Sequence, residues 1–138
     1  MSTKEYLSQA YRLDRRINSK LEQVASLNDL ATKCTSTLSD MPRDPNRATS
    51  MMADAVTKIV DLQAEINRDI DRLVDLKRDM VRAIKSVNNT EYQTILELRY
   101  LCFKTWEQIA VDMGYNVRHV YRLHDEAVES LTLPQTQQ

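Results

Sequence analysis

Residues 56–87 read VTKIVDLQAEINRDIDRLVDLKRDMVRAIKSV and contain neither glycine nor proline. Apolar side chains recur in this stretch every seven residues, and further apolar side chains fill the adjacent heptad positions. The repeat consists of Ile59, Ile66, Leu73, Met80 and Val87, with Val56, Leu62, Ile70, Leu76 and Ile84 beside it. The pattern predicts one long helix with an apolar stripe. The charged residues between positions 68 and 79, Asp69 among them, are expected on its solvated faces.

A second long helix is predicted before it, from Ser2 to about Cys34. Its apolar residues follow one another in steps of three and four, which is helical spacing. They are Ala10, Leu13, Ile17, Leu21, Val24, Leu27 and Ala31. Ser2 and Glu5 also have the spacing of a capping box, in which each side chain bonds the backbone of the other residue and so begins a helix.

Residues 35–47 include two prolines and predict a connector, with Asp44, Thr49 or Ser50 as the cap of the next helix. An amphipathic helix gains most of its stability by burying its apolar face. We therefore expect the two long helices to pack as an antiparallel hairpin, against a second copy, or both. Residues 1–88 would then form a coiled coil that supplies a homodimer, a higher homo-oligomer or a partner surface.

The last third of the chain carries shorter helical patterns, and helices are predicted over residues 91–101, 105–113 and 117–131. Their start signals are Thr90 with Gln93, Thr105 with Gln108, and Asn116. Gly114 is the single glycine of the chain and is expected in a turn with positive φ. The predicted fold class is all-α: a long antiparallel helical hairpin over residues 1–88, followed by a small three-helix domain over residues 89–138.

The composition of the 138 residues excludes several classes of protein. One glycine and three prolines stand where average usage would give roughly sixteen. Tight-turned sheets, glycine-rich phosphate loops and dinucleotide-binding crevices are therefore not expected. Cys34 and Cys102 lie far apart in sequence, which favours reduced thiols in the cytoplasm. We expect no membrane segment, because no run of 18 apolar residues occurs and the N-terminus does not resemble a signal peptide.

Residues 106–123, WEQIAVDMGYNVRHVYRL, have the spacing of a helix-turn-helix. Ala110 is small where two helices would cross, and Gly114 stands four residues later at the turn. Val120 and Leu123 would face inward, because a polar side chain there would open a small core. The stretch therefore predicts a DNA-binding domain at the C-terminal end of the sequence.

The wider segment 95–131 resembles region 4 of bacterial sigma factors. The matching residues are Leu98, Arg99, Tyr100, Ile109, Ala110, Met113, Gly114, Val120, Arg122, His124, Ala127 and Leu131. Together with the long helices, the layout resembles the small late-transcription regulators of phages of Gram-positive bacteria, the ArpU and RinA type. The resemblance implies a phage-encoded, DNA-binding transcription regulator in the bacterial host's cytoplasm. It also implies that Leu101 and Phe103 contact RNA polymerase. Cys102 and Phe103 depart from the sigma pattern, which often has a small residue or glycine there.

The charges of the last predicted helix run against its dipole. Basic residues occupy its first turns and acids follow, the reverse of the order that stabilises an isolated helix. Because the net charge of the chain is −1, any nucleic-acid site must be local. We expect the N-terminal half of helix 117–131 to enter the major groove of double-stranded DNA, with Arg118 and Arg122 as the principal contacts. The full candidate set is Lys104, Asn116, Arg118, His119, Tyr121 and Arg122.

Catalysis, metal binding and cofactors are not expected. His119 and His124 stand five residues apart and do not share one helical face, and no cysteine or carboxylate cluster accompanies them. The sequence offers no nucleophile with an adjacent base. Two other functions stay open: a helical adaptor that binds a host or phage protein, and a DNA-packaging accessory. The net charge of −3 over residues 89–138, from four basic and seven acidic residues, favours the adaptor.

Overall fold

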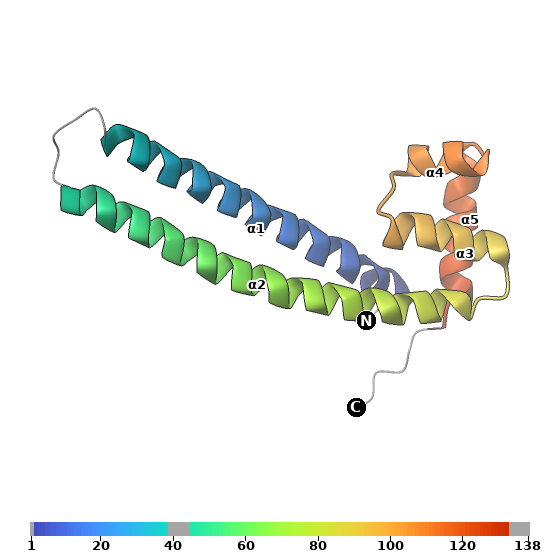
Figure 1. Ribbon diagram of the computed structural model, residues 1–138. Helices are drawn as coiled ribbons and strands as arrows, with labels where there is room; N and C mark the ends of the chain where they lie inside the picture. Colours follow the sequence, from blue (N-terminus) through green and yellow to red (C-terminus); the bar gives the residue numbers. More distant parts are fainter. Residues whose placement is uncertain (1, 39–44, 133–138) are drawn as a thin grey trace. The chain divides into compact units, whose positions relative to one another are not determined.

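The computed structural model describes residues 2–38 and 45–132, and its elements are helical throughout this part of the chain (Figure 1). The predicted all-α class is confirmed. The elements are α1 (Thr3–Leu38), α2 (Pro45–Lys85), α3 (Thr90–Leu96), the π-helical η1 (Glu97–Leu101), α4 (Trp106–Met113) and α5 (Val117–Ser130). None of the described helices combines the length and the apolar character needed to cross a lipid bilayer.

The chain divides into two compact units. We call Arg15–Arg72 the hairpin unit, and Met1–Asp14 together with Leu73–Gln138 the terminal unit. This division does not coincide with the predicted boundary between residues 88 and 89, because both long helices contribute one end to the core of the terminal unit. Leu7 of α1 and Met80 of α2 are fully buried in that core.

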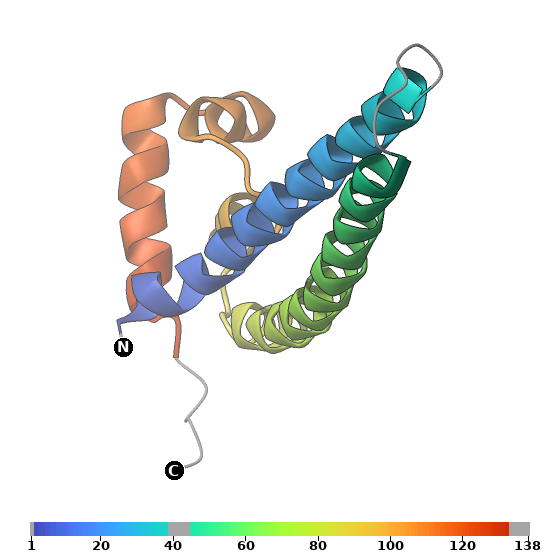
Figure 2. The same cartoon turned by 90° about the vertical axis from the view of Figure 1, so that its left-hand side faces the viewer.

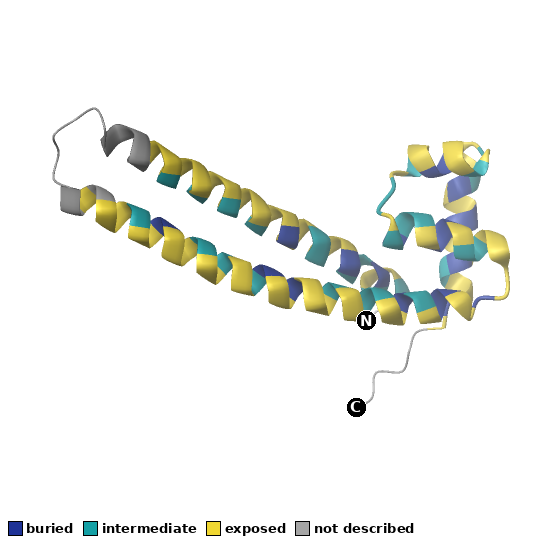
Figure 3. Cartoon of the chain, viewed as in Figure 1, coloured by how far each residue is buried: buried dark blue, intermediate teal, exposed yellow. Residues whose placement is uncertain are grey.

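In the hairpin unit, α1 and α2 run side by side in opposite directions (Figures 1 and 2). Ile17, Ala55 and Ile66 are buried on the facing sides, and outward positions are exposed (Figure 3). The predicted stripe is only partly buried, since Val56 is 51% and Ile70 is 41% exposed. Each helix has one neighbour in this unit, so only one face of it is covered.

A charged pair lies within this unit. Lys20 Nζ donates to Asp69 Oδ2 at 2.7 Å, and the Asp69 side chain is only 8% exposed. Glu65 and Arg16 stand nearby, with Lys20 Nζ to Glu65 Oε2 at 3.5 Å and Arg16 Nε to Asp69 Oδ2 at 3.9 Å. The hydrogen bond from Lys20 lowers the pKa of Asp69. The expectation that Asp69 is solvated was wrong, because α1 covers its position.

The terminal unit has one continuous apolar core. Helices α3 and α4 both pack on α5. The core residues are Leu7, Ala10, Met80, Ala83, Ile84, Val87, Ile95, Leu96, Tyr100, Ile109, Ala110, Val120, Leu123, Ala127 and Leu131. This burial holds α5 by the side that bears Val120 and Leu123 and leaves its other side exposed.

The helix starts follow the predicted signals with one correction. Ser2 and Glu5 form the expected capping box, with Ser2 Oγ accepting from the Glu5 amide at 3.2 Å and Glu5 Oε2 accepting from the Ser2 amide at 3.1 Å. Asn89, rather than Thr90, caps α3, because its side chain accepts from two backbone amides of the first turn. The Gln93 side chain instead donates to the Val87 carbonyl.

The connector is shorter than predicted at its start. Helix α1 continues to Leu38, past the expected end near residue 34, and α2 begins at Pro45. Proline suits the first helical position because its missing N–H would have no helical partner there. Pro42 and the predicted cap Asp44 lie outside the described residues.

Candidate nucleic-acid interface

Helix α4, the turn at residues 114–116 and α5 occupy the segment for which a helix-turn-helix is predicted. Gly114 has φ 73° and ψ 28°, which confirms the expected left-handed turn. Its amide donates to the Val111 carbonyl at 3.3 Å, and the Tyr115 amide donates to the Ala110 carbonyl at 3.0 Å. These bonds satisfy carbonyls at the end of α4 and reverse the chain toward α5.

Side-chain caps fix where α4 and α5 begin. Thr105 and Gln108 form the predicted capping box at the start of α4. The Asn116 side chain accepts from the His119 amide at 2.8 Å and begins α5, as predicted. Ile109 is fully buried and Ala110 is 6% exposed, so α4 packs closely on α5.

The segment before α4 contains a π-helical turn that the sequence did not indicate. In η1 the Cys102 amide donates to the Glu97 carbonyl at 3.0 Å, a separation of five residues. Phe103 follows with φ 57°, in the left-handed region that glycine adopts most readily. A residue with a side chain pays roughly 1–2 kcal/mol to adopt this conformation. Phe103 therefore carries a backbone strain that the glycine often found there in the sigma pattern would avoid.

Phe103 has side-chain contacts that offset this strain. Its ring meets the Tyr11 ring at 5.7 Å between centroids, and Lys77 Nζ lies 4.7 Å from its centre. Lys77 Nζ also donates to the Leu101 carbonyl at 3.3 Å. Leu101 and Phe103, the residues expected to meet RNA polymerase, are thus half-buried and pack within the terminal unit.

A buried polar pair connects η1 to the buried side of α5. Tyr100 Oη and His124 Nε2 lie 2.5 Å apart, and both residues are buried. On the other side of the ring, His124 Nδ1 is 3.5 Å from Asp125 Oδ1. Burial lowers the pKa of His124, because the charged imidazolium loses its hydration there. Two residues that carry the sigma resemblance therefore contact each other inside the core.

This burial predicts a pH dependence of stability. A histidine whose folded pKa lies below its unfolded value of about 6.5 contributes its full stability above that pH and loses it as the pH falls toward the folded pKa. We expect the free energy of unfolding to fall as the pH is lowered from neutral through about 6.5 toward the folded pKa of His124. His124→Gln should remove most of this loss, measured by urea denaturation at several pH values. His119→Gln is the matched control, and an equal effect of both substitutions would contradict the assignment.

Helix α5 presents two arginines on one face. Arg118 and Arg122 are exposed and stand four residues apart, so they lie one above the other on the helix. Neither forms an ion pair with any residue that the structure describes. Tyr121 beside them is 45% exposed, and its ring meets Trp106 edge-on at 5.2 Å. The N-terminal half of α5 is therefore a free cationic surface with one aromatic side chain.

Two of the three acids of α5 contact other helices. Asp125 Oδ1 lies 3.7 Å from Lys4 Nζ of α1, and Glu126 Oε2 accepts from Tyr92 Oη of α3 at 3.0 Å. Both contacts lie in the C-terminal half of the helix, within the terminal unit. Asp125 and Glu126 therefore have tertiary partners, whereas Glu129, Arg118 and Arg122 form no ion pair with a described residue.

The remaining predicted residues differ in how accessible they are. Asn116 is exposed, but its side-chain oxygen caps α5. His119 is half-buried and packs edge-on against Tyr115 at 4.5 Å. Lys104 precedes α4, away from the α5 set in sequence, and its Nζ is 2.5 Å from Asp112 Oδ2. This bond raises the pKa of Lys104, so its ammonium has a protein partner already.

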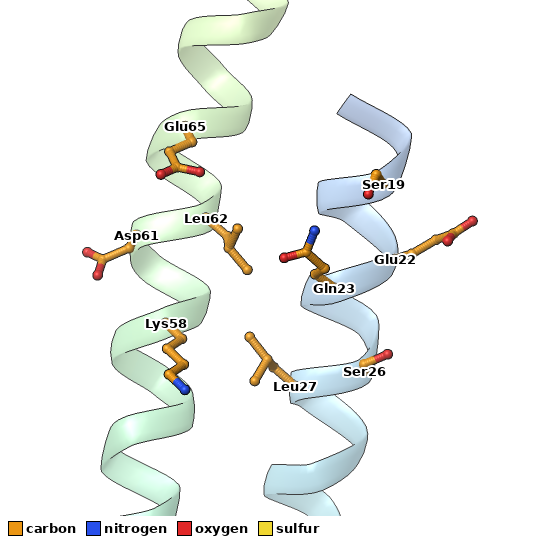
Figure 4. Close-up of a pocket in the computed structure, with 9 residues that line it drawn as sticks. All are labelled: Ser19, Glu22, Gln23, Ser26, Leu27, Lys58, Asp61, Leu62 and Glu65. Carbon is orange, nitrogen blue, oxygen red and sulfur yellow. The ribbon is translucent and has the colours of Figure 1, made fainter. Parts of the chain in front are cut away.

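The hairpin unit contains an open groove. This groove of about 650 Å³ runs between α1 and α2, and Leu27 and Leu62 point into it (Figure 4). Glu22 and Asp61 point away from the opposite helix. No group of three or more potential metal ligands gathers anywhere in the described residues. The groove brings no set of reactive side chains together.

Comparison with known proteins identifies one related family. A family model described as "Protein of unknown function (DUF1492)" matches residues 47–132, which is more than half of the chain. The match spans nearly all of α2 and every later helix, and it begins after α1. No curated protein and no solved structure matches the chain.

Proposed function

Because the chain belongs to the DUF1492 family, whose description assigns no activity, we propose from the geometry of the terminal unit that it is a sequence-specific, double-stranded DNA-binding regulator of transcription. Helix α5 is the recognition helix, and its N-terminal half enters the major groove. The protein acts without catalysis, metal or cofactor, in the cytoplasm of a bacterial host and as part of a phage programme, in line with its resemblance to sigma region 4 and to phage late regulators.

The observation that carries this proposal is the unequal pairing of charge along α5. Arg118 and Arg122 have no carboxylate partner among the described residues, whereas two of the three acids of α5, Asp125 and Glu126, have partners from α1 and α3. A solvated surface helix gains nothing from an unpaired cationic N-terminal half, since the helix dipole disfavours it. A phosphate or a guanine edge supplies the missing acceptors, and arginine binds both with two parallel hydrogen bonds.

Each candidate residue has a distinct role in this proposal. Arg118 and Arg122 contact base edges and phosphates, and Tyr121 packs beside them. The Asn116 amide nitrogen remains a donor for a phosphate while its oxygen caps the helix. His119 contributes through its exposed edge, and Lys104 reaches a phosphate only by exchanging its bond to Asp112. RNA polymerase is a secondary partner, by the sigma resemblance alone.

We expect Arg118→Ala and Arg122→Ala each to weaken binding by about tenfold, and the double variant by about a hundredfold. Loss of a phosphate contact should also reduce the salt dependence of the affinity, by about one unit of slope for each arginine. The probe is a duplex enriched by the protein from a random DNA library, titrated by fluorescence anisotropy at several salt concentrations. Arg47→Ala, which removes an exposed arginine at the beginning of α2, is the matched control.

Two results would overturn the proposal. One is failure to enrich any duplex even at low salt, which would favour the adaptor function. The other is enrichment that survives the double substitution unchanged, which would place the DNA contact elsewhere. Circular dichroism of each variant separates these results from misfolding, because both arginines are exposed and contribute nothing to the core.

A further inference from the structure

Helix α2 carries apolar side chains that no part of the hairpin unit covers, including two from the predicted stripe. Val56, Val60 and Ile70 are 51%, 57% and 41% exposed. With Gln63 and Asn67 they continue in alternating steps of four and three residues, which is the spacing of a coiled-coil seam. The residues that face α1, Ala55, Ile66 and Asp69, are buried on the adjacent face of the helix. The exposed seam therefore has the pattern of an interface and no partner in the hairpin unit.

We infer that this seam binds α2 of a second copy of the chain. The two helices run antiparallel, and the two-fold axis between them lies at the level of residue 65. In that register Val60 faces Ile70 of the partner subunit, and Gln63 faces Asn67 of the partner subunit. A two-fold axis makes each of these contacts twice, as it must in an interface between identical surfaces. The two apolar layers then flank a central polar layer.

The polar layer favours this register over other antiparallel registers. The Gln63 and Asn67 side chains are exposed and have no hydrogen bond to another described residue. An amide facing an amide gives each group both a donor and an acceptor. A shift along the helix would set these amides against valine or isoleucine and leave them unpaired, which is costly in an apolar seam. Single polar layers specify the register of coiled coils in this way.

The charges beside the seam also fit an antiparallel pair. Asp61 points away from α1 (Figure 4), and Arg68 is exposed one heptad later. Neither forms an ion pair with another described residue. In the antiparallel register Asp61 lies within one residue, about 1.5 Å along the helix axis, of the level of Arg68 of the partner subunit, again twice. A parallel, in-register pair would set each charge at the level of its own copy, with no opposite charge beside it.

The dimer also has a consequence for DNA binding, and this consequence rests on the proposed function. A two-fold dimer offers two copies of α5, so its operator would contain two inverted half-sites. The self-association itself rests only on the hairpin unit. Its failure and the failure of DNA binding are therefore separate results, measured in the absence and in the presence of DNA.

Disulfide trapping tests the orientation. In full-length protein with Cys34→Ser and Cys102→Ser, V60C chains are mixed with tagged I70C chains under mild oxidation. We expect mixed disulfides between the two kinds of chain and none within either kind. Two copies of position 60 would lie ten residues apart along the antiparallel helices, about 15 Å, which no disulfide spans. Disulfides between V60C chains alone, or no disulfide at all, would overturn the proposal.

Charge reversal tests the register in solution. Sedimentation velocity should find the wild-type chain dimeric at micromolar concentration and Ile70→Asp monomeric, with Val111→Asp as the control at another exposed valine. Asp61→Arg and Arg68→Asp should each weaken the dimer severalfold, and the double reversal should restore it. A monomeric wild type at about 100 µM, or a double reversal no better than the single ones, would overturn the proposed pairing.

Discussion

Lys20→Met is expected to lower the free energy of unfolding by about 3 kcal/mol, the loss typical of removing one partner from a buried ion pair. The substitution keeps the length and the apolar stem of the side chain but removes the ammonium that donates to Asp69 at 2.7 Å. Asp69 is 8% exposed in the wild-type chain, and Arg16, whose Nε is 3.9 Å from Asp69 Oδ2 there, is the nearest cation that the substitution leaves. Urea denaturation followed by circular dichroism measures the loss.

The pH dependence of this loss identifies its cause. Asp69 has a folded pKa below its unfolded value of about 3.9, chiefly because Lys20 donates to it. Its contribution is therefore complete above that pH and disappears as the pH falls through the folded pKa. The difference between wild type and Lys20→Met should shrink below pH about 4, since protonation removes the buried charge in both.

A double variant provides the control. Lys20→Met with Asp69→Leu removes both charges, and replacing a buried pair by apolar residues is often neutral or stabilising. Its stability should return to within about 1 kcal/mol of the wild type. A double variant as unstable as Lys20→Met would mean that packing of the lysine stem, rather than the charge left on Asp69, sets the loss.

Ile109→Ala should destabilise the terminal unit by about 3 kcal/mol, within the usual range for truncating a buried isoleucine. Ile109 is fully buried where α4 packs on α5. Val111 lies two residues away on the same helix and is 80% exposed, so Val111→Ala should change the stability by less than about 0.5 kcal/mol. Thermal unfolding of both variants measures the contrast.

The same pair of variants separates the folding of the site from its chemistry. Ile109→Ala removes no basic residue, so any DNA affinity that it loses should return at low temperature, where the variant is folded. Arg118→Ala should lose affinity at every temperature. Equal stability of the Ile109 and Val111 variants would contradict the packing of α4 on α5, which positions the proposed recognition helix.

Local signals were the most predictable part of this protein. The capping boxes at Ser2 and Thr105, the cap at Asn116 and the left-handed turn at Gly114 all occur where the sequence indicated them. Each depends on a few neighbouring residues and on backbone groups that must be satisfied at a helix end. The one displaced cap, Asn89 in place of Thr90, is an error of a single residue between two polar side chains that both favour capping.

The partners of charged residues were not predictable in the same way. Asp69 bonds Lys20, 49 positions away, and Asp125 and Glu126 contact α1 and α3. A periodic pattern shows that a charge lies off the apolar stripe, but it does not show which helix arrives opposite it. At the candidate interface, the tertiary structure therefore decides which basic residues have an ion-pair partner. Lys104 is paired with Asp112, whereas Arg118 and Arg122 form no ion pair with a described residue.

The sequence by itself determined that this chain is helical and where most of its helices begin and end, because helical periodicity, caps and a single glycine act over a few residues. The tertiary structure decided the division into units and the faces of α2 that are covered. It also decided the pairing of charges on α5. The reason is physical: burial and ion pairing depend on which surfaces meet, and residues from Leu7 to Leu131 converge on one core through contacts that no local pattern encodes.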